Sequence, residues 1–154
     1  MKRRSFLSLL TAAVLPEIST MAASASVPVI TVYKTPSCGC CHDWVMHLQK
    51  NGFEVVAYDV PDTSPYRSKL GVPKELGSCH TGVIDGYALE GHVPATEIKR
   101  LLAEKPRARG LSVPGMVVGS PGMETDGTRR DAFDVVLFDD AGARKVYKHY
   151  PARS

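Results

Sequence analysis

The chain has 154 residues, a formal net charge of +3 and four cysteines. A chain of this length forms one ordinary domain, and so weak a positive charge gives no sign of nucleic acid or an anionic membrane as a partner. Much of the positive excess lies at the N-terminus, where Lys2, Arg3 and Arg4 are balanced by a single acid, Glu17, among the first 25 residues.

The N-terminus has the three parts of a secretory signal peptide. A basic start is followed by an apolar stretch at 7–15 and by the small-residue site Ala23-Ser24-Ala25. The apolar stretch is shorter than the roughly 20 residues of a membrane-spanning helix, so we predict no permanent membrane anchor. We predict that 1–25 is a signal peptide, either twin-arginine or general secretory, and that 26–154 form one periplasmic domain.

The first part of this domain alternates strand, helix and strand. The β-branched run at 29–33 predicts a buried strand, and 53–60 predict a second one. Between them, apolar residues share one face of a helix from Cys41 to about Lys50, which Asn51-Gly52 ends. A strand–helix–strand unit of this kind predicts two parallel strands.

A hairpin and a helix complete the domain. After a short helix at 66–70, Asp85-Gly86 joins two predicted strands, 81–84 and 87–90, and Pro94 suits the first turn of a following helix. This order predicts a thioredoxin-like α/β fold, glutaredoxin-like in its βαβ part. The remainder reads as a long Gly/Pro/Met loop at 106–132 and a C-terminal β-hairpin with strands at about 132–138 and 143–147.

Three cysteines, Cys38, Cys40 and Cys41, lie where the first strand turns into the first helix. Amide groups and the helix dipole stabilise a thiolate there, so we predict a lowered pKa for Cys38. Cys38 and Cys41 have the C-x-x-C spacing of disulfide oxidoreductases. Cys40 adds a third soft donor, which favours Cu(I) and allows thiolates to bridge several copper ions.

Two other metal groups fit this motif less well. A structural zinc site needs a closed tetrahedron, and the adjacent Cys40 and Cys41 project in different directions. With His42 the motif also reads C-x-x-C-H, the attachment pattern of haem c. The surrounding βαβ pattern argues against haem, because small c-type cytochromes are mainly helical.

Five motifs follow one another along the chain: Tyr33-Lys34-Thr35-Pro36-Ser37-Cys38-Gly39-Cys40-Cys41, Ser78-Cys79-His80-Thr81, Glu90-Gly91-His92-Val93-Pro94-Ala95, Val113-Pro114-Gly115-Met116 and Gly119-Ser120-Pro121-Gly122-Met123-Glu124. Together they resemble the CopG family of periplasmic, thioredoxin-like copper-resistance proteins. The resemblance implies copper at the C-x-C-C motif, in a cysteine-bridged cluster, and a role in handling Cu(I) and Cu(II). Val117 departs from the family, which typically has a proline after the first loop methionine.

Cys79 opens the first strand of the predicted hairpin. In thioredoxin-like folds this segment passes beside the C-x-x-C turn, usually through a cis-proline, but Leu76-Gly77-Ser78-Cys79 contains no proline. We predict that Cys79 is a fourth thiol for copper or a resolving thiol; the alternative is a buried structural cysteine. Strand alternation places the neighbouring His80 on the opposite face.

The remaining candidate ligands are methionines and histidines. Met116 and Met123 are soft thioether donors on the Gly/Pro loop, although loop methionines also pack on cores. His42 either ligates copper or stabilises a thiolate as an imidazolium, the alternative being a solvated side chain. The family motif singles out His92. Asp43, Glu90 and Glu124 are candidates for orienting the ligands.

Two functions follow from these residues. The first is a periplasmic copper-binding protein that sequesters copper or converts Cu(I) to Cu(II), with a metal set of Cys38, Cys40, Cys41, Cys79, Met116, Met123, His42 and His92. Its partners would be copper ions, more than one per chain, and other periplasmic copper-handling proteins. The alternative is a thiol–disulfide oxidoreductase that uses Cys38 and Cys41.

Overall fold

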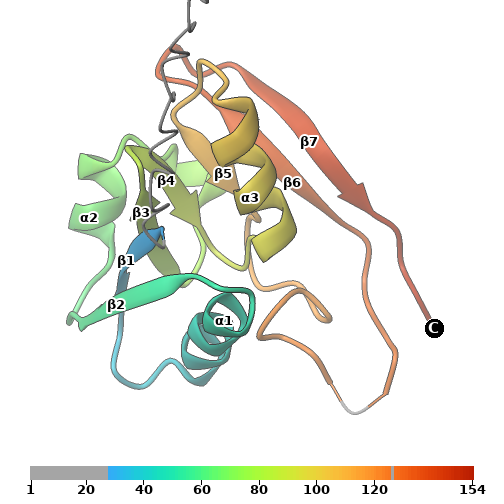
Figure 1. Ribbon diagram of the computed structural model, residues 1–154. Helices are drawn as coiled ribbons and strands as arrows, with labels where there is room; N and C mark the ends of the chain where they lie inside the picture. Colours follow the sequence, from blue (N-terminus) through green and yellow to red (C-terminus); the bar gives the residue numbers. More distant parts are fainter. Residues whose placement is uncertain (1–27, 126) are drawn as a thin grey trace, which may run out of the picture.

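A computed structural model describes residues 28–125 and 127–154, and the predicted signal peptide lies outside the described residues. In this part of the chain, three α-helices and a 3₁₀ turn at Lys74–Leu76 surround a single seven-stranded sheet (Figure 1). The elements are β1 (Val29–Lys34), α1 (Gly39–Lys50), β2 (Glu54–Asp59), α2 (Ser64–Lys69), β3 (His80–Ile84), β4 (Tyr87–Glu90), α3 (Ala95–Glu104), β5 (Gly110–Ser112), β6 (Phe133–Phe138) and β7 (Arg144–Tyr150).

The sheet has the order β2-β1-β3-β4-β5-β6-β7. β1 and β2 are parallel, with Val29 opposite Glu54, and α1 connects them, which confirms the predicted strand–helix–strand unit. β3 runs antiparallel to both β1 and β4, and the turn between β3 and β4 is Asp85-Gly86, as predicted. This order brings the C-terminal end of β1 beside the N-terminal end of β3, where Lys34 pairs with His80.

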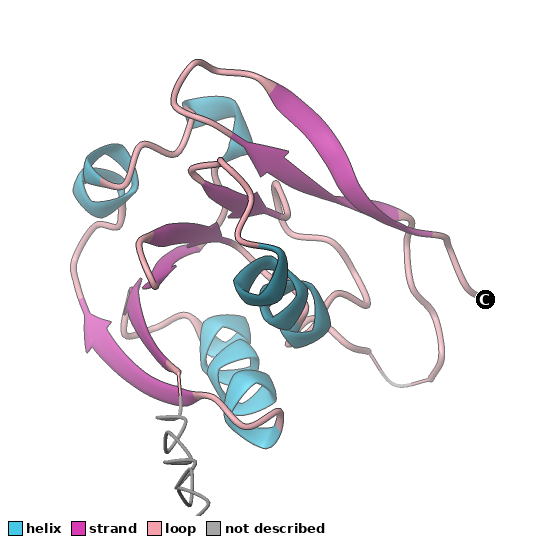
Figure 2. Cartoon of the chain, turned by 45° about the horizontal axis from the view of Figure 1, so that its top comes forward, coloured by secondary structure: helices cyan, strands magenta, loops and turns pink. Residues whose placement is uncertain are grey.

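The main core lies between the sheet and two helices. α1 and α3 cover the same face (Figures 1 and 2), and each contributes fully buried side chains, Trp44 and Leu48 from α1 and Ile98 and Leu101 from α3. On the other face, the segment from α2 to the 3₁₀ turn packs in a second, smaller cluster with β4 and β6. Among the described residues, no helix is both long and apolar enough to cross a membrane.

The structure corrects the sequence prediction in two places. α1 begins at Gly39, so Cys40 and Cys41 lie inside its first turn. The predicted loop at 106–132 contains β5, which pairs with β4 on one side and with β6 on the other. The C-terminal hairpin therefore extends the same sheet. Gly110 permits this close pairing, because a Cβ at that position would overlap the backbone of Ala88.

Candidate metal centre

The cysteine turn is built by the junction of β1 and α1. Cys38 is the N-cap of α1: its amide donates to Thr35 O (3.2 Å) and its carbonyl accepts from His42 N (3.3 Å). No acidic residue lies in the first turn of the helix. The unpaired amides and the positive end of the helix dipole therefore favour negative charge on sulfur at this position.

Two of these cysteines are joined. Cys38 and Cys41 form a disulfide, and the sulfur of Cys40 lies 3.6 Å from that of Cys38. Cys41 is fully buried, whereas Cys40 is a half-buried free thiol. The structure is thus that of the oxidised chain, in which the thiol of Cys40 lies close to the disulfide. The predicted pKa of Cys38 stays a prediction, because a disulfide sulfur does not titrate.

Cys79 joins this group from the other segment. It lies immediately before β3, and the sulfurs of Cys38, Cys40, Cys41 and Cys79 all lie within 4.8 Å of one another. Burial, and then the neighbouring Cys40, raise the pKa of the Cys79 thiol to about 12. The structure thus brings together the four cysteines that the sequence analysis grouped. Their role as metal ligands stays a prediction.

Two imidazoles face Cys79 and form a second donor group with it. Its Sγ lies 3.2 Å from Nε2 of His92 and 3.3 Å from Nδ1 of His80. Nδ1 of His92 lies 2.8 Å from the carbonyl oxygen of Pro121, which can only accept a hydrogen bond. Nδ1 therefore carries the proton, and in the neutral ring Nε2 directs its lone pair toward the sulfur.

The surroundings of both rings favour the neutral form of the imidazole. Burial lowers the pKa of His92, and it lowers the pKa of His80 to about 3, with His92 as a further cause. His80 is fully buried beside Trp44, and the centroids of the two rings lie 4.2 Å apart. Nε2 of His80 has no hydrogen-bond partner, and it is the one buried side-chain nitrogen or oxygen among the described residues of which this is true. A neutral imidazole is the form that binds metals.

The prediction for His80 was wrong. Alternation placed its ring on the face opposite Cys79, but alternation holds only inside a strand, and β3 begins at His80. Sequence reasoning could have found this residue from the adjacency of Cys79 and His80 ahead of a strand. His42, by contrast, is exposed on the first turn of α1 and belongs to neither donor group.

The Gly/Pro loop contacts the Cys79 segment and the α1 segment through the glycines that precede its two methionines. Before Met116, the Gly115 amide donates to Gly77 O (3.2 Å). Before Met123, Gly122 has φ +82° and lies against α1, where a Cβ would stand 2.8 Å from Cys40 O. Met116 is exposed and Met123 half-buried. The loop thus lies beside the cysteines, and ligation by the methionines stays a prediction.

The fold and the site define an α/β protein whose cysteine cluster, drawn from two chain segments, has the geometry to hold metal ions. A family model described as "Protein of unknown function, DUF411" matches residues 76–123. A search of curated proteins gave no match. A solved structure named "Copper resistance protein copG- Form 2" is 50% identical, covers 81% of this chain and 99% of its own, and has a TM-score of 0.77.

A second solved structure, "Copper resistance protein copG- Form 1", is also 50% identical. It covers 80% of this chain and 97% of its own, with a TM-score of 0.76. The chain belongs to the CopG family of copper resistance proteins, which confirms the resemblance that the sequence motifs carried.

Proposed function

We propose that this protein binds Cu(I) in a polynuclear cluster bridged by Cys38, Cys40, Cys41 and Cys79, and so contributes to copper resistance. The observation that carries the proposal is the gathering of four sulfurs within 4.8 Å, from segments 38 residues apart. Thiolate sulfur is the ligand that Cu(I) prefers, and it bridges ions. Membership of a copper-resistance family favours copper over other soft metals.

Copper loading begins with reduction of the Cys38–Cys41 disulfide. A dithiol reductant supplies two electrons and two protons: its thiolate attacks one sulfur, the S–S bond breaks, and the mixed disulfide resolves on the reductant. Four thiols result. Each thiol that binds Cu(I) then loses its proton, because the thiolate is the metal ligand. Burial favours the protonated form of Cys79, so this thiol also releases a proton when it binds the metal.

Further donors surround the cluster. Nε2 of His92 would ligate copper at the Cys79 end, because its lone pair points at that sulfur. Met116 and Met123 would complete sites at the loop, where the neighbouring Gly115 and Gly122 are held against the cysteine segments. His42 lies outside both donor groups and has the least support among the proposed ligands.

A mixed set of sulfur and imidazole donors suits copper in both oxidation states, which supports a role in redox conversion. Each Cu(I) that becomes Cu(II) gives one electron to an external one-electron acceptor. Oxidation and re-reduction of the copper, followed by electron paramagnetic resonance of Cu(II) and by thiol counting, tests this role. A Cu(II) signal that cycles with constant thiols supports conversion, whereas loss of thiols at each cycle leaves sequestration alone.

The setting that we propose is the periplasm, after removal of residues 1–25, with residues 26–154 as one thioredoxin-like domain. The support for this fold is the arrangement of β1, α1 and β2 as a parallel unit, followed by the antiparallel β3–β4 hairpin and α3. β5, β6 and β7 extend that sheet.

One measurement tests copper binding directly: anaerobic titration of the reduced protein with Cu(I) against a competing chelator. We expect more than one tightly bound Cu(I) per chain, and a loss of affinity or stoichiometry in Cys40→Ser. The structure also favours a second candidate, a thiol–disulfide oxidoreductase, because Cys38 and Cys41 form a disulfide. Disulfide exchange that survives in Cys40→Ser, together with weak Cu(I) binding by the wild type, would select this candidate.

A further inference from the structure

The segment that carries Cys79 has no regular structure to hold it. β3 begins only at His80, so Ser78 and Cys79 lie outside the β-ladder. The proline-free segment also contains no cis peptide bond, and none occurs among the described residues. Another part of the molecule must therefore hold the fourth thiol beside the cysteine turn.

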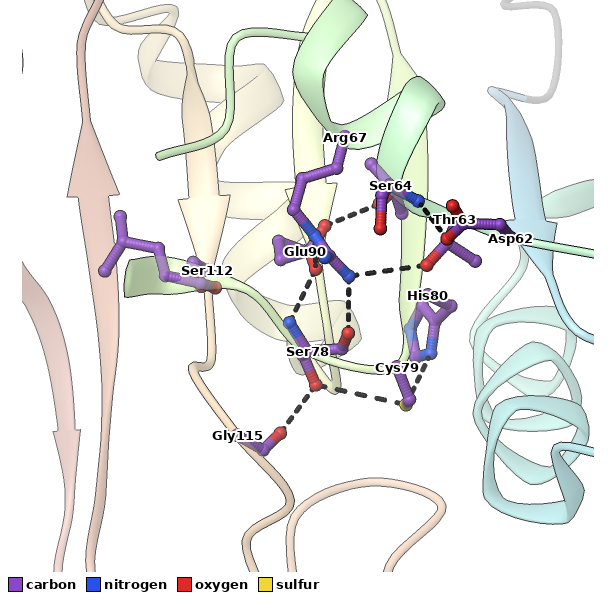
Figure 3. A network of polar contacts seen from close by, with 12 residues as sticks. Asp62, Thr63, Ser64, Arg67, Ser78, Cys79, His80, Glu90, Ser112 and Gly115 are labelled. Atoms are coloured by element: carbon purple, nitrogen blue, oxygen red, sulfur yellow. Dashed lines mark hydrogen bonds and ion pairs between the residues drawn. The ribbon is translucent and has the colours of Figure 1, made fainter. Parts of the chain in front are cut away.

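A buried ion pair binds the backbone of Ser78 (Figure 3). Arg67 on α2 donates from Nε to Oε1 of Glu90, the last residue of β4, at 2.7 Å. Glu90 accepts the Ser78 amide at Oε1 (2.6 Å), and Arg67 donates from Nη2 to the Ser78 carbonyl (2.5 Å). The carboxylate accepts a hydrogen bond from the Ser78 N–H, and the guanidinium donates one to the Ser78 C=O. Both backbone polar groups of Ser78 are therefore hydrogen-bonded without a neighbouring strand.

The ion pair is itself held firmly. Glu90 is fully buried, and its second oxygen accepts from the Thr81 hydroxyl at 2.6 Å. Arg67 is mostly buried and also approaches Thr63 Oγ1 at 3.4 Å. Both charges are compensated locally, so the pair fixes the Ser78 backbone without adding net charge beside the sulfurs. Apolar side chains of similar volume often give a protein equal stability, so the distinctive contribution of this pair is the position of the Ser78 backbone that it holds.

Ser78 also connects the cysteine segment to the Gly/Pro loop. Its hydroxyl donates to the carbonyl of Gly115 at 2.5 Å and lies 3.9 Å from Cys79 Sγ. One anchored residue thus holds the backbone before Cys79 and the backbone before Met116.

We propose that Arg67 and Glu90 are positioning residues for the copper site: their ion pair fixes Ser78, and through Ser78 it holds Cys79 in place relative to the cysteine turn. This proposal rests on the proposed copper-binding function. According to this proposal, two residues on α2 and β4 affect copper affinity although neither of them is a candidate ligand. Loss of residues that orient metal ligands costs about 10- to 100-fold in affinity.

The decisive variant is the double substitution Arg67→Met with Glu90→Leu. It removes both charges together and leaves no uncompensated buried charge, so the fold is expected to survive. The matched control is Glu97→Gln, which alters another buried glutamate, one that accepts a hydrogen bond from the Tyr150 hydroxyl. Thermal unfolding of the apoproteins and Cu(I) competition of the reduced proteins at low temperature are measured for each.

We expect the double variant to unfold cooperatively and to bind Cu(I) at least about tenfold more weakly, while Glu97→Gln keeps wild-type affinity. A second readout needs no metal: in the oxidised protein, alkylation of Cys79 should become faster relative to alkylation of Cys40. A folded double variant with wild-type affinity and a wild-type alkylation ratio would overturn the proposal.

If the double variant does not unfold cooperatively, the Cu(I) affinity of Arg67→Lys tests the proposal in its place. Lysine keeps the positive charge but lacks the planar fork that reaches Glu90 and Ser78 together, so we expect weaker Cu(I) binding here too. Unchanged affinity in this variant would overturn the proposal. A wild-type protein that fails to bind Cu(I) overturns the proposed function instead, and the alkylation ratio still tests the positioning of Cys79.

Discussion

The sulfur of Cys79 lies 3.2 Å from Nε2 of His92, although the two residues come from separate segments on either side of the β3–β4 hairpin. The other ring nitrogen of His92 donates to Pro121 O, so the Gly/Pro loop sets the orientation of the imidazole that meets the thiol. Three segments therefore converge on one sulfur–nitrogen contact, and each can be tested separately.

The two predicted histidine ligands should differ in their effect on copper. His92→Ala removes an oriented lone pair beside Cys79, and we expect Cu(I) affinity to fall by about tenfold or more. His42→Ala alters an exposed ring outside both donor groups, and we expect it to cause the smaller loss of affinity of the two variants. Chelator competition of the reduced proteins measures both, and the reverse ranking would show that His42 is the ligand.

Gly122 should tolerate no side chain. Its φ of +82° and the Trp44 amide, which a Cβ would approach to 2.6 Å, leave no space for alanine. Gly142 has a similar φ of +84° but open space around it. Gly142→Ala is therefore a control that measures only the cost of a left-handed backbone conformation, about 1–2 kcal/mol.

Gly122→Ala should therefore lower the free energy of unfolding by more than its control does, and it should displace the loop at Gly122 from α1. Denaturant unfolding gives the two free energies, and Cu(I) titration shows whether the displaced loop alters stoichiometry. Equal destabilisation of the two variants would contradict the close packing of this loop on α1.

The number of free thiols should depend on the redox state. In the oxidised chain, Cys40 and Cys79 are free and Cys38 and Cys41 are joined, so a thiol reagent in denaturant should count two. After treatment with a dithiol reductant and its removal, the count should be four. Peptide mass mapping of the oxidised protein identifies the bonded pair, and a disulfide that includes Cys40 would contradict the assignment.

Export should remove the N-terminus. If residues 1–25 are a signal peptide, the intact mass of periplasmic protein should correspond to a chain that begins at Ser26. Replacing Arg3 and Arg4 by lysine separates the two export routes, because a twin-arginine signal requires the arginines and a general secretory signal needs only positive charge. A full-length chain retained in the cytoplasm would contradict the proposed export.

The strands and helices near the site could be predicted because their apolar residues repeat with a clear period. β5 could not, because it has three residues and is held by pairing with β4 and β6 rather than by a pattern of its own. The cysteine grouping followed from the fold order, but His80 and the Arg67–Glu90 pair did not. Arg67 and Glu90 are 23 residues apart, and only the packing of α2 beside β4 brings them together.

The Cys38–Cys41 disulfide has a practical consequence for any measurement of the copper-to-protein ratio. An oxidised sample carries half the free thiols of a reduced one, and a partly oxidised sample is a mixture of two populations with different capacities. Its average stoichiometry would describe neither population and would drift with storage time. Copper contents from separate preparations therefore become comparable only when each is reported beside the number of thiols measured in the same tube.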